Sequence, residues 1–171
     1  LRELAARGGV IQVVAVADPM KDGSNYGYGA EKRGGREVGK AAVDKFYSEA
    51  ANKPSRVCKA YADFRELLDK ADVDAIQICA PDHWHCYMAV AAARKGIHLY
   101  GQKPLALTVG EGRRMVSEIA KAGVTWQTGS QQRSDLDFRF VSELARNGRI
   151  GKVKRVRIGL PGGHKNWNQW A

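Results

Sequence analysis

The chain has 171 residues, of which 44% are hydrophobic, and it carries a formal net charge of +10. This is enough for one domain, or for one domain and part of a second, but no run of about 18 apolar residues occurs, which excludes a membrane-spanning helix. The charge does not by itself indicate a nucleic-acid partner, because the one dense basic run, residues 152–157, lacks a nucleic-acid motif and an aromatic platform.

The first strand that the sequence predicts covers residues 10–17 and ends at Asp18. An acid at the end of the second strand of a nucleotide-binding βαβ unit accepts hydrogen bonds from the ribose 2′-hydroxyl of NAD. A glycine fingerprint should lie about 20 residues before that acid, and residues 1–17 contain none. Either there is no dinucleotide site, or the first strand and its glycine loop lie upstream of Leu1. Asp18 could also simply cap a turn, because Asp-Pro is a turn signal.

A glycine-rich loop follows over residues 20–36. Its Gly27-Tyr28-Gly29 resembles half a fingerprint but follows no strand directly, so we interpret it as loop. The pattern then predicts a helix over residues 37–51, a strand over 57–61 and a helix opened by the capping pair Asp63 and Glu66.

The segment 74–105 is the most informative part of the chain. Residues 74–80 predict a strand buried on both faces, which Pro81 ends. Asp82 is expected to cap a helix that Gly96 ends. The apolar residues that recur at helical spacing on it are Trp84, Tyr87, Met88, Ala91 and Ala92.

A second strand is predicted over residues 97–100, followed at once by Gly101-Gln102-Lys103-Pro104. The unit is therefore βαβ, and its right-handed crossover places the loops after both strands at one edge of a parallel sheet. Open α/β sheets bind their ligands at that edge.

The remaining sequence continues the alternation of strand and helix. Thr108 and Glu111 predict a capping box for a helix that ends at Gly123, and residues 124–128 predict a strand. Ser134 is expected to cap a helix with Phe138, Val141 and Leu144 on its apolar face, and residues 150–160 predict a basic strand. The alternation predicts an α/β fold with a doubly wound parallel sheet.

Three motifs carry a resemblance to a known family: Ala80-Pro81-Asp82-His83-Trp84-His85, Gln102-Lys103-Pro104-Leu105 and the block 127–133. Over nearly its whole length the chain resembles the glucose-fructose oxidoreductase, inositol dehydrogenase and rhizopine-catabolism (Gfo/Idh/MocA) family. The resemblance implies a Rossmann domain over residues 1–129, incomplete at its N-terminus, and the beginning of a second α/β domain over 130–171. It also implies hydride transfer between NAD, with NADP as the alternative, and a sugar, polyol or related hydroxyl or carbonyl compound.

The resemblance implies roles for individual residues. Lys103 corresponds to the lysine near the nicotinamide and the substrate oxygen, where an ammonium would stabilise developing alkoxide charge. Asp18 corresponds to the acid that binds the adenosine ribose. The other residues that the resemblance places at the cofactor are Ala80, Pro81, Asp82, His83, His85, Gln102, Pro104, Gln131 and Arg133.

The chain departs from the family pattern in three places. Gln102 stands where the family usually has glutamate, the glycine fingerprint is missing, and the second domain stops early. We therefore expect a fragment of a longer parent protein, which forms homo-oligomers through the missing C-terminal domain. A non-catalytic nucleotide-binding or interaction module of the same fold is the second hypothesis.

Several single residues allow more than one interpretation. His83 and His85, with Cys79 and Cys86 nearby, suggest zinc, but residues two apart at a helix start point in different directions, so we expect no metal site. His85 could instead cap or pack its helix. The acid at residue 18 favours NAD over NADP, although Lys21 and Arg33 could reverse this. Trp167 and Trp170 could stack on a sugar or anchor a second domain.

The cysteine content bears on the compartment. The three cysteines are odd in number and lie in or beside predicted apolar elements, which argues against a disulfide framework. Reduced thiols favour the cytoplasm. The expected missing start leaves an export signal upstream of Leu1 open.

Overall fold

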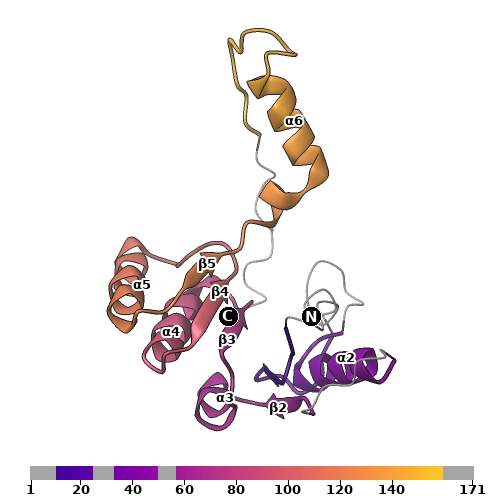
Figure 1. Cartoon of the computed structure of the whole chain (residues 1–171), viewed down its shortest axis with the longest axis vertical. Helices are drawn as coiled ribbons and strands as arrows, with labels where there is room; N and C mark the ends of the chain where they lie inside the picture. The colour runs from indigo at the N-terminus through magenta and orange to yellow at the C-terminus, as the bar shows by residue number, and fades with distance from the viewer. Residues whose placement is uncertain (1–10, 25–32, 50–56, 160–171) are drawn as a thin grey trace. The chain divides into compact units, whose positions relative to one another are not determined.

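The structure is a computed structural model that describes residues 11–24, 33–49 and 57–159. The chain divides into two compact units, residues 1–129 and residues 130–171. The first unit contains β1 (Ala15–Ala17), α2 (Arg36–Glu49), β2 (Lys59–Tyr61), α3 (Phe64–Lys70), β3 (Ala75–Ile78), α4 (Asp82–Ala93), β4 (His98–Gly101), α5 (Val109–Ala122) and β5 (Trp126–Thr128) (Figure 1). The second contains the short helix η1 (Gln131–Ser134) and α6 (Leu136–Arg146). The motif Gly27-Tyr28-Gly29 and the residues Trp167 and Trp170 lie outside the described residues.

Every strand pairing is parallel, as the alternation of strand and helix predicts. The strands form two groups, β1-β2 and β3-β4-β5. In the described part of the chain no strand pairs with the other edge of β1 or of β3, so the single continuous sheet that we expected is divided. In the strand order 3-2-1-4-5-6 of the dinucleotide-binding fold, the division falls where the first strand belongs.

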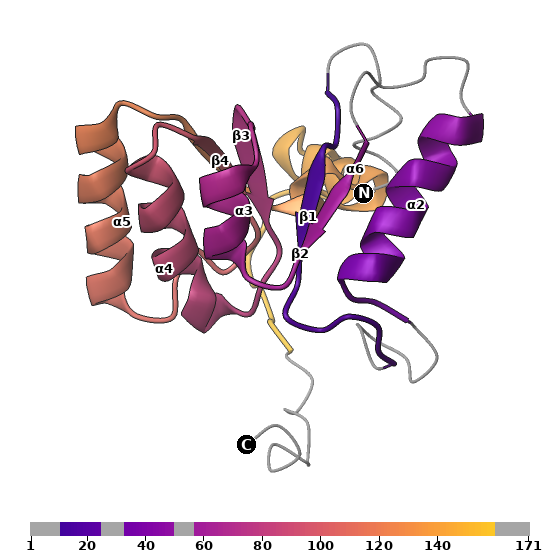
Figure 2. The same ribbon diagram turned by 90° about the horizontal axis from the view of Figure 1, so that it is seen from below.

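Helices cover both sides of these strands, which makes the arrangement doubly wound. Figure 2 shows α2 on one side of β1 and β2, and α3, α4 and α5 on the other side of the strands. Because neighbouring strand residues point to opposite faces, Ala15 packs into the core under α3 to α5, while Val16 packs with Val43 and Tyr47 of α2.

The buried side of α4 differs from the predicted apolar face. His85, Ala89, Ala92 and Ala93 are at most 1% exposed, and form one stripe along the helix. Alanine lets a helix lie close to the strands it covers, whereas a large ring does not fit there. Trp84 and Tyr87 accordingly turn outward, at 40% and 67% exposure.

Most predicted helix ends are confirmed. Gly96 has a φ of +75°, and the bonds from Gly96 N to Ala93 O and from Ile97 N to Ala92 O close α4 with a Schellman motif. Thr108 and Glu111 form the predicted capping box of α5.

Three capping predictions need correction. The N-cap of α4 is Pro81, and Asp82 is the first helical residue, with its carboxylate accepting from His83 N. Asp63 caps α3 as predicted, but Glu66 pairs with Lys70 one turn later instead of reaching back. Asp135, not Ser134, caps α6, because Ser134 belongs to η1.

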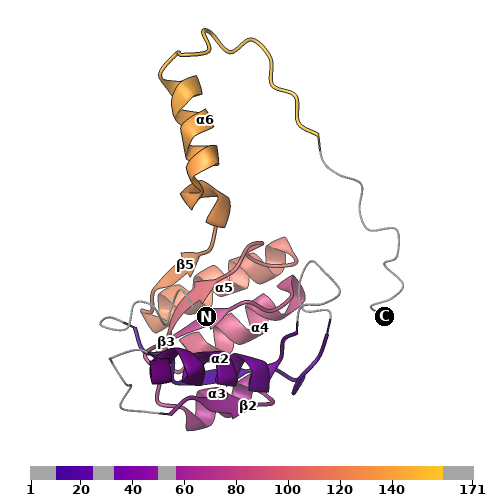
Figure 3. The ribbon, with the colours of Figure 1, turned by 90° about the vertical axis from the view of Figure 1, so that its right-hand side faces the viewer.

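The described residues of the second unit do not form the predicted basic strand. Residues 151–159 follow α6 as an extended trace without strand pairing (Figure 3). A strand needs hydrogen bonds from a neighbouring strand, and no described segment of this unit supplies one. Consequently Val153, Val156 and Ile158 remain 52%, 72% and 83% exposed.

Gly101 is expected to be intolerant of a side chain. A Cβ at this position would overlap the indole ring of Trp126, which a 2.8 Å bond from Nε1 to Thr128 Oγ1 holds in place. Gly101→Ala should therefore lower the free energy of unfolding by about 1–3 kcal/mol, measured by urea titration. Gly110→Ala is the control, because a Cβ there meets only Thr108 Oγ1 at 3.9 Å. Equal stability of the two variants would contradict the packing argument.

Candidate active site

The loops after β3 and β4 lie at one edge of the three-stranded sheet, as the βαβ unit predicts. The register places Ile78 opposite Gly101. A 2.9 Å bond from Gln102 N to Ile78 O extends the ladder one residue beyond β4. The segment Pro81–His85 and the turn Gln102–Pro104 therefore begin side by side.

The turn after β4 holds the backbone of Lys103 from both sides. The Gln102 side-chain oxygen accepts a 2.7 Å bond from Lys103 N, and the peptide bond between Lys103 and Pro104 is cis. The side-chain carbonyl oxygen of glutamine and the carboxylate of glutamate can both accept this bond. Gln102 therefore fills the same acceptor role as the glutamate that the family usually has. The Lys103 side chain is exposed, and its ammonium has no partner among the described residues. The turn thus presents a cation that no acid in the described part of the chain neutralises.

His85 lies behind these loops instead of on their surface. It is 1% exposed, with Nδ1 2.7 Å from Pro104 O and Nε2 2.8 Å from Ala80 O. The ring therefore contacts both loops from inside. From the sequence we considered a packing role only in second place, although the spacing of four residues to Ala89 and seven to Ala92 signals a shared helix face.

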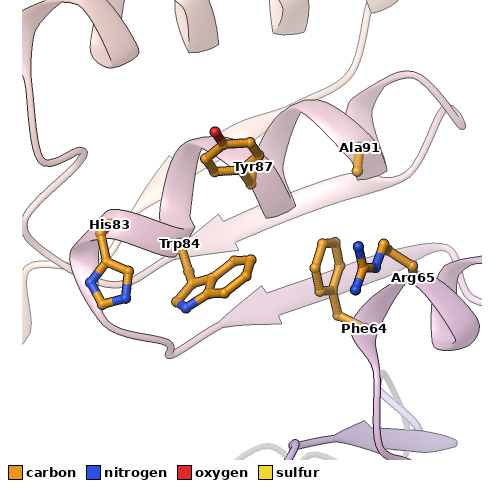
Figure 4. Close-up of a pocket in the computed structure, with 6 residues that line it drawn as sticks. All are labelled: Phe64, Arg65, His83, Trp84, Tyr87 and Ala91. Carbon is orange, nitrogen blue, oxygen red and sulfur yellow. The ribbon is translucent and has the colours of Figure 1, made fainter. Parts of the chain in front are cut away.

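The first turn of α4 also opens onto an aromatic groove. Its volume is about 490 Å³, and it is lined by Phe64, Arg65, His83, Trp84, Tyr87 and Ala91 (Figure 4). The Trp84 ring meets Phe64 and Tyr87 edge-on at centroid distances of 6.2 and 6.1 Å. The Arg65 guanidinium lies over the Phe64 ring and donates to Asp63. Because most of the other lining side chains are aromatic, the groove is largely apolar. Its lining comes from two separate helices, so no local sequence pattern indicates it.

Asp18 follows β1, whose only described strand partner is β2. Its carboxylate accepts a 2.8 Å bond from Met20 N, and Arg36 donates to the backbone carbonyls of Asp18 and Pro19. Arg33, which we considered as a 2′-phosphate ligand, pairs with Asp22 instead. Among the described strands, no hydrogen-bonded pairing joins Asp18 to the Lys103 turn.

Gln131 and Arg133 lie in η1, in the second unit. Both side chains are exposed. The structure therefore brings together the residues after β3 and β4 and does not join Asp18, Gln131 and Arg133 to them. The cofactor role of every one of these residues stays a prediction.

The described residues contain no cluster of three His, Cys, Asp or Glu side chains that could hold a metal ion. They also contain no helix long and apolar enough to cross a membrane. The cysteines Cys58, Cys79 and Cys86 are free thiols. Burial raises the pKa of Cys58 to about 11 and raises that of Cys86 as well.

Comparison with known proteins identifies the family. The profile of the Gfo/Idh/MocA oxidoreductase family, with an NAD-binding Rossmann fold, matches residues 23–130. The chain belongs to this family. The resemblance carried by the two loop motifs is thereby confirmed, and so is the Rossmann-type α/β fold.

Several relatives share parts of the chain. Myo-inositol 2-dehydrogenase of Thermotoga maritima is 37% identical over 100 residues, which are 58% of this chain and 30% of that protein. A crystal structure of a probable dehydrogenase from Thermotoga maritima has a TM-score of 0.55 at 28% identity, over 81% of this chain and 34% of that one. Scyllo-inositol dehydrogenase from Lactobacillus casei, crystallised with NAD(H) and scyllo-inositol, has a TM-score of 0.60 at 21% identity, over 87% and 37% of the chains, and shows a shared fold alone. The chain spans about a third of the length of these relatives.

The thiols should differ in reactivity. Cys79 is exposed, whereas Cys58 is 2% exposed with a pKa of about 11 instead of 9.0, so a thiol reagent should modify Cys79 first and Cys58 only after unfolding. Mass spectrometry of the labelled protein measures this. Rapid labelling of Cys58 in the folded protein would contradict its burial.

The raised pKa of Cys58 also affects stability. Because the Cys58 thiol ionises at lower pH in the unfolded chain than in the folded one, the free energy of unfolding should fall as the pH rises from 9.0 toward about 11.

Proposed function

We propose that this chain forms most of the cofactor-binding part of an NAD-dependent oxidoreductase that transfers hydride between nicotinamide and a sugar, polyol or related hydroxyl or carbonyl compound. The observation that carries the proposal is the Lys103 ammonium, which has no partner among the described residues and follows the carboxyl end of β4 in a chain of the NAD-binding Gfo/Idh/MocA family. The myo-inositol and scyllo-inositol dehydrogenases among the relatives support a polyol substrate.

The residues present suit an NAD site. Loops at the carboxyl ends of parallel strands are where such sheets bind ligands. Asp18 ends β1 with a carboxylate that could accept ribose hydroxyls, and it repels a 2′-phosphate. Lys103 and Pro104 would lie beside the nicotinamide, with the loop from Ala80 to His83 along the dinucleotide and the buried ring of His85 behind it.

The proposed role of Lys103 is electrostatic. Oxidation of a hydroxyl compound removes hydride from carbon and a proton from oxygen, and NAD supplies the hydride acceptor when it is bound. An ammonium placed at the substrate oxygen stabilises the negative charge that develops as the proton leaves. The Gln102 side chain and the His85 ring hold the backbone on either side of Lys103, which fixes the point from which its side chain extends. We propose that a base in the second domain of the parent protein takes the proton.

The proposal extends to the organisation of the parent protein. Residues 1–129 would form the Rossmann domain, completed by a strand and glycine loop upstream of Leu1, and residues 130–171 would begin the C-terminal domain. That domain would supply the substrate pocket and the homo-oligomer interface. Three free thiols support a reducing compartment such as the cytoplasm.

Lys103→Ala in the parent protein should remove most turnover while leaving NAD affinity nearly intact, because the ammonium acts on the substrate oxygen. The expected loss in kcat is about 100- to 1000-fold, the effect of removing one transition-state donor. Steady-state kinetics with a polyol screen and calorimetry with NAD measure both quantities. Lys121→Ala, an exposed lysine in the last turn of α5, is the matched control. Unchanged turnover in Lys103→Ala would contradict the proposed electrostatic role of Lys103.

Asp18 should set the cofactor preference. Calorimetric titration of the parent protein is expected to give tighter binding of NAD than of NADP. Asp18→Asn should weaken NAD binding by about 10- to 100-fold, since a charged hydrogen bond contributes about 1.5–3 kcal/mol. Asp69→Asn on α3 is the control, because it changes the net charge equally. If neither nucleotide binds, the dehydrogenase proposal fails, and an interaction module of the same fold takes its place.

A further inference from the structure

His85 is the one buried polar or charged side chain among the described residues. It occupies the first position of the α4 stripe, where the pattern of Ala89, Ala92 and Ala93 leads one to expect another small apolar residue. No described carboxylate lies within 4.0 Å of its ring nitrogens. A polar ring at such a site needs hydrogen-bond partners, because burying it without them is costly.

Both ring nitrogens have a partner, and both partners can only accept. Nδ1 lies 2.7 Å from Pro104 O, and Nε2 lies 2.8 Å from Ala80 O. A ring nitrogen that carries a hydrogen donates to the carbonyl oxygen that faces it. The ring therefore bridges the two carbonyl oxygens, and the tautomer decides which nitrogen donates.

The two carbonyls belong to different loops. Ala80 O lies between β3 and the N-cap of α4, and Pro104 O directly follows Lys103. The contact to Pro104 spans 19 residues of sequence. With Gln102 bonded to Lys103 N on the other side, the backbone of Lys103 is fixed before and after the residue.

We propose that His85 is a positioning residue, whose buried ring ties the turn that carries Lys103 to the loop after β3. Its ring lies behind both loops and touches neither substrate nor cofactor. It acts by holding the backbone from which the Lys103 side chain extends. This inference rests on the proposed function for its catalytic consequence, while the bridge between the two loops follows from the geometry alone.

The bridge is tested without any activity. In the parent protein, His85→Leu keeps the buried volume but removes both ring nitrogens, so amide hydrogen exchange should become faster in the segments 80–82 and 102–105. His98→Leu is the matched control, because the His98 ring accepts a 3.0 Å bond from Thr125 N, which belongs to neither loop. Unchanged exchange of both segments in His85→Leu would overturn the proposal, whether or not the protein proves to be a dehydrogenase.

The positioning role is tested by a double-mutant cycle. His85→Gln keeps a polar side chain, but its single amide nitrogen can reach only one of the two carbonyls. It should lower kcat by about 100-fold, as expected for a misplaced catalytic group, with NAD affinity nearly unchanged. In a Lys103→Ala background the same substitution should cause no further loss, because there is no ammonium left to position.

The outcomes separate positioning from packing. Equal losses of kcat in both backgrounds would mean that His85 only supports the fold, and the positioning role would be wrong. His85→Leu adds a check, since it fills the volume without any donor and should lose at least as much kcat as His85→Gln. If the parent protein turns over no polyol, the proposed function fails, and the hydrogen-exchange measurement still decides whether the ring bridges both loops.

Discussion

The hydrogen-bonded pairing of β3 with β4 is the constraint on which the rest of the site depends. The parallel register sets Ile78 beside Gly101, so β3 and β4 end at the same level of the sheet. The alanine stripe of α4 allows the connecting helix to lie against both strands. From this follow the short reach from His85 to Pro104 and the placement of the Lys103 turn beside the start of α4.

The charges of the first unit follow a second pattern, in which most cations near structural elements have an acid beside them. Arg94 and Arg114 share Glu118, and the hydrogen bond from Arg94 lowers the pKa of that carboxyl. Arg33 is likewise paired with Asp22. These exposed pairs contribute little stability, but they leave Lys103 as a strand-end cation without an acid among the described residues. An unneutralised cation is one of the groups that can stabilise developing negative charge.

Features that depend on a few neighbouring residues were predictable. The capping box of Thr108 and Glu111 and the left-handed Gly96 involve backbone groups within one helical turn, so the local sequence specifies them. Where two residues compete for one cap, local reasoning was wrong, as for Ser134 beside Asp135. The basic segment after α6 shows the other limit, because a strand depends on a partner that no local pattern names.

The sequence by itself determined the α/β class, the βαβ unit, the family, and the two loop motifs that meet at one sheet edge. Periodicity, turn residues and motif spacing are local properties and can be read along the chain. Only the tertiary structure decided which face of α4 is buried, that Trp84 and Tyr87 line an outer groove, and that His85 bridges Ala80 and Pro104. These depend on which surfaces pack together across residues distant in sequence, and burial and hydrogen-bond partners are settled by that packing.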